Sequence, residues 1–232
     1  MSMLNVSEST VRRLFQELES KGKVIRTLGG IQLIQNNIFD YSFDNIEQRQ
    51  VQEKTRISEY AGNFLNAGDV AFFDSGTTMY YLSIAVADRI KSGALKDIIV
   101  FTNSLANLQI LSPVCETILV GGKYRFKRRD FVGYTSEKMV KDYNYSKCFI
   151  GADGINLTEG MMTTDIDTGR INELIVERSD KVIALIDSKK FDKRSFTSYA
   201  PLDKIDIIVT DSALPEETKE KYGKTGVNII YV

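Results

Sequence analysis

Short apolar runs recur along the chain, and each stops at a cluster of small or polar residues. The six runs are Phe72-Phe73, Val100-Phe101, Leu119-Val120, Phe149-Ile150, Leu185-Ile186 and Ile208-Val209. Runs of this length, separated by helix-length segments, predict buried parallel strands. In open α/β sheets ligands bind outside the carboxyl ends of such strands, so the clusters that follow them are expected to converge on one site.

Helical segments separate these runs. Helices are expected over 53–65, 78–90, 106–111, 136–142, 167–178 and 216–222. Because strands and helices alternate, we expect an α/β fold with a mainly parallel sheet flanked by helices.

The amino-terminal segment shows a different pattern, a helix followed by a hairpin. A helical apolar face is formed by Val11, Leu14, Phe15 and Leu18. The helix is expected between Ser7 and Gly22, and strands are expected at 23–28 and 31–34 around the turn Gly29-Gly30. The predicted division is therefore 1–34, a polar linker at 35–52 that becomes helical near its end, and a main domain at 53–232.

Composition narrows the possible chemistry. The chain has 232 residues, 43% of them hydrophobic, which is enough for a real core, and its formal net charge is −1. No histidine is present, which excludes Ser–His and Cys–His catalysis and ordinary zinc sites. With only Cys115 and Cys148, a disulfide framework is excluded as well. We expect no cofactor and no metal, and a cytoplasmic protein without a secretory signal or membrane span.

The cluster Asp74-Ser75-Gly76-Thr77-Thr78 stands between a predicted strand and a predicted helix. Backbone N–H groups and hydroxyls at a helix N-terminus favour an anion such as phosphate. An ordinary turn with a threonine cap is the alternative. No Walker A loop, dinucleotide fingerprint or nucleophile elbow is present.

Other clusters at strand ends carry candidate ligand groups. Gly121-Gly122 would let a ligand approach the backbone, and Arg125 could reach a phosphate, although a tight turn beside a basic surface explains both equally. Asp153 could accept hydrogen bonds from sugar hydroxyls or cap the next segment. Lys189 ends a strand on the expected ligand edge.

The amino-terminal helix carries polar residues off its apolar face. Ser9, Arg12, Arg13 and Gln16 could meet phosphates and base edges in a major groove. A solvated helix face is the simpler interpretation. The adjoining hairpin with Arg26 favours DNA binding, because a helix followed by a basic wing is a known DNA-binding arrangement.

Taken together, these motifs resemble one family. The stretches that carry the likeness include Val6 to Arg13, Ile25-Arg26-Thr27, Asp74 to Thr78, Thr102-Asn103-Ser104, Gly121-Gly122, Phe149 to Gly154, and Asp187 to Phe191. In this order they resemble the DeoR-type bacterial repressors over essentially the whole chain.

The resemblance implies a transcriptional regulator of a sugar-metabolism operon, a repressor and not an enzyme. It implies a truncated winged helix-turn-helix and a sensor domain like ribose-5-phosphate isomerase or CoA transferase in fold. The implied effector residues for a phosphorylated sugar are Asp74, Ser75, Gly76, Thr77, Thr78, Thr102, Asn103, Ser104, Gly121, Gly122, Asp153 and Lys189. Arg125 joins them as a candidate because it follows the Gly121-Gly122 turn and could reach a phosphate. The implied contacts to operator DNA are Ser7, Ser9, Thr10, Arg12, Arg13, Arg26 and Thr27.

The implied assembly is a homodimer or homotetramer, because paired DNA-reading heads require pairing of subunits. Family members have two further helices before the Val6-Ser7 stretch, so the helix-turn-helix is expected to be partial. Leu14-Phe15 also follow Arg13, where the family commonly has Asp-Leu.

Two other functions stay open. A sugar-phosphate isomerase would carry a glutamate after Gly-Ala-Asp, and this chain has Gly154 there. A sensor or oligomerisation module without DNA binding would fit the shortened amino terminus.

Overall fold

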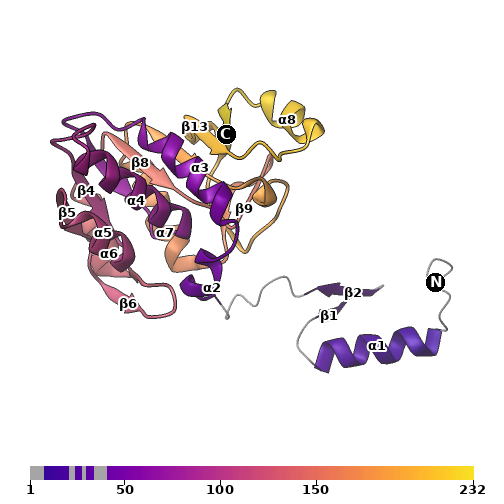
Figure 1. Cartoon of the computed structure of the whole chain (residues 1–232). Helices are drawn as coiled ribbons and strands as arrows, with labels where there is room; N and C mark the ends of the chain where they lie inside the picture. Colours follow the sequence, from indigo (N-terminus) through magenta and orange to yellow (C-terminus); the bar gives the residue numbers. More distant parts are fainter. Residues whose placement is uncertain (1–7, 21–23, 28–29, 34–40) are drawn as a thin grey trace. The chain divides into compact units, whose positions relative to one another are not determined.

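A seven-stranded parallel sheet organises the carboxy-terminal part of the chain (Figure 1). Its strand order is β14-β13-β11-β8-β3-β4-β5. The strands are β3 (Val70–Phe73), β4 (Ile99–Thr102), β5 (Glu116–Leu119), β8 (Lys147–Ile150), β11 (Val182–Leu185), β13 (Ile207–Thr210) and β14 (Asn228–Tyr231). All six predicted runs are therefore confirmed as strands, and β14 is an edge strand that the pattern did not predict.

The computed structural model describes residues 8–20, 24–27, 30–33 and 41–232. The chain divides into two units, Met1–Tyr41 and Ser42–Val232. Among the described residues, no helix combines the length and the apolar character needed to cross a membrane.

Helices cover both faces of the sheet, and all six predicted helices are confirmed to within a few residues. They are α3 (Val51–Gly62), α4 (Thr77–Lys91), α5 (Leu105–Leu111), α6 (Tyr134–Lys141), α7 (Ile166–Glu177) and α8 (Glu216–Gly223). On one face Phe73 packs in a cluster with Ile57 of α3 and Leu82 of α4. On the other face Phe72 packs in a cluster with Ile171 of α7. Burial on both faces explains why the strands are continuous apolar runs.

Several short elements were not predicted. The strands β9 (Gly154–Asn156), β10 (Gly160–Thr163) and β12 (Thr197–Ala200) form an antiparallel sheet in the order β12-β10-β9. The strands β6 (Lys123–Arg125) and β7 (Asp130–Val132) form a hairpin. Two 3₁₀ turns, η2 (Ser188–Lys190) and η3 (Leu202–Lys204), flank strands of the main sheet.

Part of the expected linker is helical. Residues 35–52 include α2 (Phe43–Glu47) and the first residues of α3, and the second unit begins at Ser42. Phe43 is buried and its ring meets that of Tyr80 edge-on at 5.8 Å between centroids. A single buried aromatic thus anchors a segment whose polar sequence resembles a linker.

The amino-terminal unit contains the expected helix and hairpin. Helix α1 (Glu8–Ser20) is followed by β1 (Val24–Thr27) and β2 (Gly30–Leu33), which pair antiparallel. On the apolar face of α1, Leu14 is 47% exposed, whereas Val11 and Phe15 are half-buried. Ser7, where this helix is expected to begin, lies outside the described residues.

The central strands make a direct prediction about stability. Phe149 of β8 is fully buried against Phe73, with ring centroids 5.2 Å apart. Phe149→Ala is expected to lower the free energy of unfolding in urea by about 3–5 kcal/mol, because it leaves a cavity. Phe196, which is 58% exposed, is the control. Phe196→Ala is expected to change stability by less than about 0.5 kcal/mol. Equal effects of the two variants would contradict this packing.

Candidate functional site

The strand order of the main sheet reverses between β3 and β8. From β3 the chain proceeds through β4 and β5 to one edge, and from β8 through β11, β13 and β14 to the other. All neighbouring strands are parallel, so the six predicted clusters lie at the same carboxyl edge of the sheet. A crevice outside this reversal point is the usual ligand site of an open α/β sheet.

Asp74 occupies the reversal point. Its N–H donates to the carbonyl of Phe149 at 3.0 Å. Its carboxylate accepts from the N–H of Ser75 at 2.6 Å and of Gly151 at 3.3 Å, and from Asn172 Nδ2 at 3.4 Å. Burial raises the pKa of this carboxyl to about 6, although these hydrogen bonds act to lower it. One side chain therefore joins the ends of β3 and β8 to α7.

The turn Thr102-Asn103-Ser104 is packed directly beside Asp74. Thr102 Oγ1 donates to the carbonyl of Phe73 at 2.7 Å and accepts from the N–H of Ser104 at 3.1 Å. Ser104 caps α5 by accepting from Asn107 N at 3.3 Å. Asn107 Nδ2 in turn donates to the Asp74 carbonyl at 2.9 Å. The structure thus brings two of the predicted clusters together.

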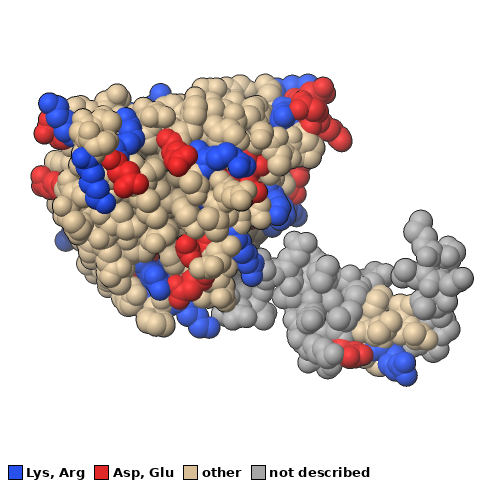
Figure 2. Space-filling model, viewed as in Figure 1, with Lys and Arg blue, Asp and Glu red and all other residues tan. Residues whose placement is uncertain are grey.

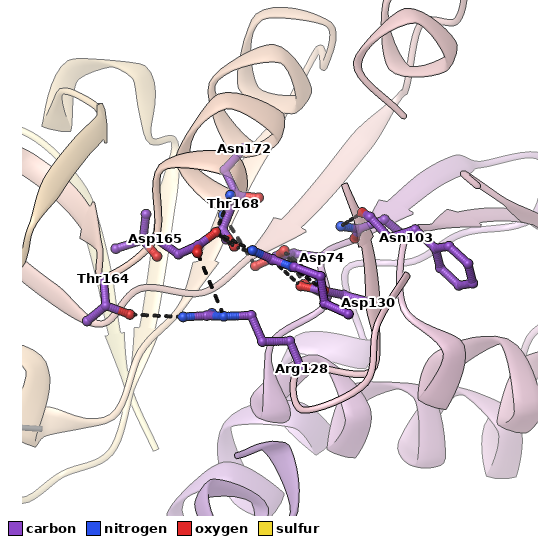
Figure 3. A network of polar contacts seen from close by, with 12 residues as sticks. Asp74, Asn103, Arg128, Asp130, Thr164, Asp165, Thr168 and Asn172 are labelled. Atoms are coloured by element: carbon purple, nitrogen blue, oxygen red, sulfur yellow. Dashed lines mark hydrogen bonds and ion pairs between the residues drawn. The ribbon is translucent and has the colours of Figure 1, made fainter. Parts of the chain in front are cut away.

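Arg125 links the β6–β7 hairpin to the start of α7. It binds both oxygens of Asp130, with Nε and Nη2 at 2.8 and 2.7 Å, and Asp130 also accepts from Ser75 Oγ at 3.2 Å. Its Nη1 lies 2.5 Å from Asp165 Oδ1 and its Nη2 lies 2.8 Å from Thr168 Oγ1. Figure 3 shows Asp74, Asp130, Asp165 and Thr168 gathered in this network.

The two carboxylates shape the electrostatics of this network. Burial alone would raise the pKa of Asp165, but hydrogen bonds from Arg125 and from the N–H of Thr168 hold it below its ordinary value. Burial likewise works against the charge of Arg125, yet Asp130 and Asp165 raise its pKa. Arg125 is therefore a fully charged, partly buried cation already neutralised by two acidic partners.

Gly121 and Gly122 position the same hairpin. Ser136 Oγ donates to the Gly121 carbonyl at 2.8 Å. A Cβ on Gly122 would lie 2.2 Å from Ser136 Oγ and 2.7 Å from the carbonyl of Val132. The close approach that requires glycine here is made by the protein's own chain, which is the turn interpretation offered above.

Asp153 is held by the second sheet. Its Oδ2 accepts from Thr163 Oγ1 at 3.1 Å and from the N–H of Thr164 at 2.8 Å. Thr164 Oγ1 also lies 3.3 Å from Arg128 Nη2, a contact that Figure 3 displays. Lys190 Nζ approaches Asp153 at 4.0 Å. Asp153 thus belongs to the same polar region as Arg125, through Thr164 and Asp165 between β10 and α7 and through Arg128.

Lys189 follows β11 in η2 and makes a different contact. Its Nζ donates to Gln50 Oε1 at 2.7 Å. Nearby Lys54 donates to the carbonyls of Ile46 at 2.6 Å and Glu47 at 3.4 Å, at the end of α2. Burial lowers the pKa of Lys54 to about 8, with Asp187 acting in the opposite direction. Lysines therefore stand at the carboxyl edge on the β11 side, and arginines on the hairpin side.

The predicted DNA contacts all belong to the first unit. Ser9, Thr10, Arg12 and Arg13 lie in α1, and Arg26 and Thr27 lie in β1, whereas Ser7 lies outside the described residues. Arg13 is exposed. The side chains of Ser9, Arg12, Arg26 and Thr27 are outside the described set.

Several residues of the network were missed from the sequence. They are Asn107, Arg128, Asp130, Asp165, Thr168 and Asn172. Asp165 was readable, because an aspartate three residues before a threonine matches a helix cap, and Asp165 does accept from Thr168 N at 2.8 Å. The pairing of Arg125 with Asp165 and Thr168 could not be predicted, since these residues lie 40 and 43 positions away.

The network retains hydrogen-bonding capacity. Asn103 Oδ1, Asn107 Oδ1 and Asn172 Oδ1 are buried and have no hydrogen-bond partner within the described part of the chain. Unsatisfied carbonyl oxygens suit the hydroxyl donors of a polyol. No group of three or more carboxylates or cysteines among residues 41–232 and the described amino-terminal residues is arranged to hold a metal ion.

Family models match both units. The model for the "DeoR C terminal sensor domain" matches residues 49–212, and that for the "DeoR-like helix-turn-helix domain" matches residues 1–37. The chain belongs to the DeoR family. As a DeoR-family chain it is a transcriptional regulator and not an enzyme.

Individual relatives agree with this family membership. The HTH-type transcriptional regulator IolR of Bacillus subtilis is 34% identical over 93% of this chain and 84% of that protein. The HTH-type transcriptional regulator GlpR of Haloferax volcanii is 31% identical over 98% of this chain and 87% of that protein. The lactose phosphotransferase system repressor of Streptococcus mutans is 34% identical over 90% and 82%.

Among solved structures, ribose 5-phosphate isomerase A of Methanocaldococcus jannaschii is similar with a TM-score of 0.46 and 14% identity. The match covers 61% of this DeoR-family chain and 54% of that chain.

The buried carboxyl of Asp74 gives this DeoR-family sensor a distinctive pH dependence. Its pKa of about 6 exceeds the ordinary value of 3.8, so between about pH 4 and pH 6 the folded state binds a proton that the unfolded chain releases. Stability contributed by Asp74 therefore falls as the pH rises through this window. Asp74→Asn is expected to remove that fall, as measured by urea unfolding at a series of pH values.

Asp69 supplies a control of opposite sign. Burial alone would raise its pKa, but hydrogen bonds from Lys147 and the N–H of Asn66 hold it below the ordinary value. The stability from Asp69 is thus present above its ordinary pKa and is lost as the pH falls through the folded pKa. In the profile of unfolding free energy against pH, Asp69→Asn should remove only the loss of stability on the acid side. Parallel profiles for wild type and Asp74→Asn would show that the pKa of Asp74 is not raised.

Proposed function

We propose that this regulator represses a sugar-metabolism operon by binding operator DNA through its first unit, and that a phosphorylated sugar binds at the carboxyl edge of the main sheet. The single observation that carries the effector site is the start of α4. This 15-residue helix begins at the reversal point of the sheet, and its N-cap is Gly76, a residue that has no side chain to accept from the first N–H groups of the helix. Its first N–H groups and its positive dipole end favour a phosphate.

The residues around α4 support the sugar part of the ligand. Ser75, Thr77 and the Thr102-Asn103-Ser104 turn are buried polar groups at the same edge. The amide oxygens of Asn103, Asn107 and Asn172 would accept from sugar hydroxyls. Arg125, Asp153 and Lys189 are proposed to surround the ligand from the hairpin, the second sheet and η2. The name of one relative also points to sugar metabolism, the lactose phosphotransferase system repressor of Streptococcus mutans.

The proposed assembly is a homodimer or homotetramer in the cytoplasm, because operator half-sites are read by paired heads. Effector binding would then shift an equilibrium between arrangements of these heads.

The effector site is tested by thermal stabilisation with a panel of hexose and pentose phosphates, each beside its unphosphorylated sugar. A ligand at 100 times its dissociation constant should add roughly 2.7 kcal/mol of stability, and only phosphorylated sugars are expected to do so. Lys189→Ala is expected to weaken the binding of the best ligand by roughly tenfold or more, the usual loss when a charge-assisted hydrogen bond is removed.

Lys204 is the matched control for Lys189. Both are lysines of 3₁₀ turns, but η3 precedes β13 and so lies at the opposite, amino edge of the sheet. Lys204→Ala should leave binding unchanged. Stabilisation by none of the phosphates, or equal effects of the two lysine variants, would refute the effector site.

DNA binding is tested by fluorescence anisotropy of the full chain with fragments from upstream of its own gene. Affinity should fall steeply with salt, because cation contacts to phosphates release counterions. Arg13→Ala in α1 is expected to weaken binding. Arg194→Ala, a side chain 79% exposed in the second unit, should not. Absence of binding at low salt would instead support a sensor module that does not bind DNA.

A further inference from the structure

The first segment of the second unit contacts three of the segments that carry candidate effector residues. This entry segment comprises residues 42–50 and contains α2. It follows directly on the chain that leads from the DNA-binding unit, which ends at Tyr41. Its contacts are with the β6–β7 turn, with α4 and with η2.

The contact with the β6–β7 turn is the most extensive. The N–H of Phe43 donates to the carbonyl of Lys127 at 2.8 Å. Asp44 Oδ1 lies 2.7 Å from Arg129 Nη2, and the same guanidinium stands 5.3 Å from the centroid of the Phe43 ring. In Figure 2 acidic and basic side chains adjoin one another where Figure 1 places α2.

The entry segment also contacts α4 and η2. Glu47 Oε1 accepts from Tyr81 Oη of α4 at 2.9 Å. Gln50 adopts a left-handed conformation with φ of 52° and accepts from Lys189 of η2. The entry segment is therefore held by α4, by η2 and by the hairpin turn at the same time.

Residues of the β6–β7 turn contact both the start of α7 and the entry segment. Arg125 and Arg128 reach Asp165 and Thr164 at the start of α7, whereas Lys127 and Arg129 contact the entry segment. Arg129 has a left-handed φ of 54°, a conformation that costs free energy in a residue other than glycine. Its carbonyl accepts from Leu105 N at 2.9 Å, directly after the Thr102-Asn103-Ser104 turn. A change of the five-residue stretch 125–129 on the α7 side is therefore expected to alter its contacts with the entry segment.

We infer that the entry segment, residues 42–50, is the element that couples the effector site to the DNA-binding unit, through the β6–β7 turn. An anionic group that draws Arg125 or Arg128 away from Asp165 reshapes the turn and loosens its contacts with Phe43 and Asp44. The inference rests on the proposed function only for the nature of the ligand. Asp44 and Arg129 are then positioning residues, which act at a distance from the ligand.

The test measures amide hydrogen exchange in the full chain without effector or DNA. Asp165→Asn removes one of the two carboxylate charges that hold Arg125, the one at the start of α7. It is expected to raise the exchange rate of the Phe43 amide by roughly tenfold, because this amide exchanges only when its hydrogen bond to the carbonyl of Lys127 opens. Thr168→Val removes the hydroxyl that accepts from Arg125 and donates to Asp165 at 2.9 Å. It should act in the same direction and serves if Asp165→Asn does not fold.

Coupling must also be reciprocal. Asp44→Ala is expected to change exchange of the Thr168 amide, which donates to Asp165 at 2.8 Å. Glu159→Gln is the control, because it breaks a comparable ion pair with Arg194 on the second sheet. It should leave both reporter amides unchanged.

Unchanged exchange at Phe43 in Asp165→Asn or Thr168→Val, alongside faster exchange at the start of α7, would overturn the inference. So would equal effects of Glu159→Gln. Because no ligand is added, failure of every sugar phosphate to bind would count against the proposed function alone.

Discussion

The buried carboxylate of Asp74 is the interaction on which the rest of the carboxyl edge depends. It receives hydrogen bonds from Ser75, Gly151 and Asn172, which come from three separate elements. A buried acceptor with several donors is costly to remove, because each donor would be left unsatisfied. Asp74 therefore keeps the ends of β3 and β8 in register with α7 and sets where α4 begins.

A second layer of polar contacts extends from Asp74 through Ser75 and Asp130 to Arg125. These groups are mostly buried, so replacing one partner would leave a charge without compensation. Such networks confer a unique arrangement more than net stability. Here they hold a hairpin of only three residues per strand against the N-terminus of α7. Both a regulator and an isomerase could use this edge of a sheet, and family membership decides for the regulator.

Regulation by a small molecule requires energetic coupling between the effector site and the DNA-binding site. The entry segment is placed to transmit such a coupling, since hydrogen bonds and the Asp44–Arg129 ion pair join it to segments on both sides of the carboxyl edge. Its anchor is small, one buried Phe43, so the contacts can rearrange without loss of the core. The hydrophobic core is built around strands such as β3, β8 and β11.

Local pattern in the sequence determined the alternating strands and helices, the helix and hairpin of the first unit, and the polar clusters at the strand ends. These were predictable because a strand buried on both faces, such as β8, must be apolar throughout, and because the residue after it must turn. Membership of the DeoR family was likewise recognisable from the order of those clusters.

Tertiary structure alone decided which clusters meet and through what contacts. Strands as short and polar as β6 carry no periodic signal, and α2 looks like a linker because a single aromatic anchors it. Arg125 pairs with Asp165 and Lys189 with Gln50, 40 and 139 positions away, since these partners meet only once the sheet is assembled. The apolar pattern specifies which residues are buried, whereas the pairing of charges depends on the path of the folded chain.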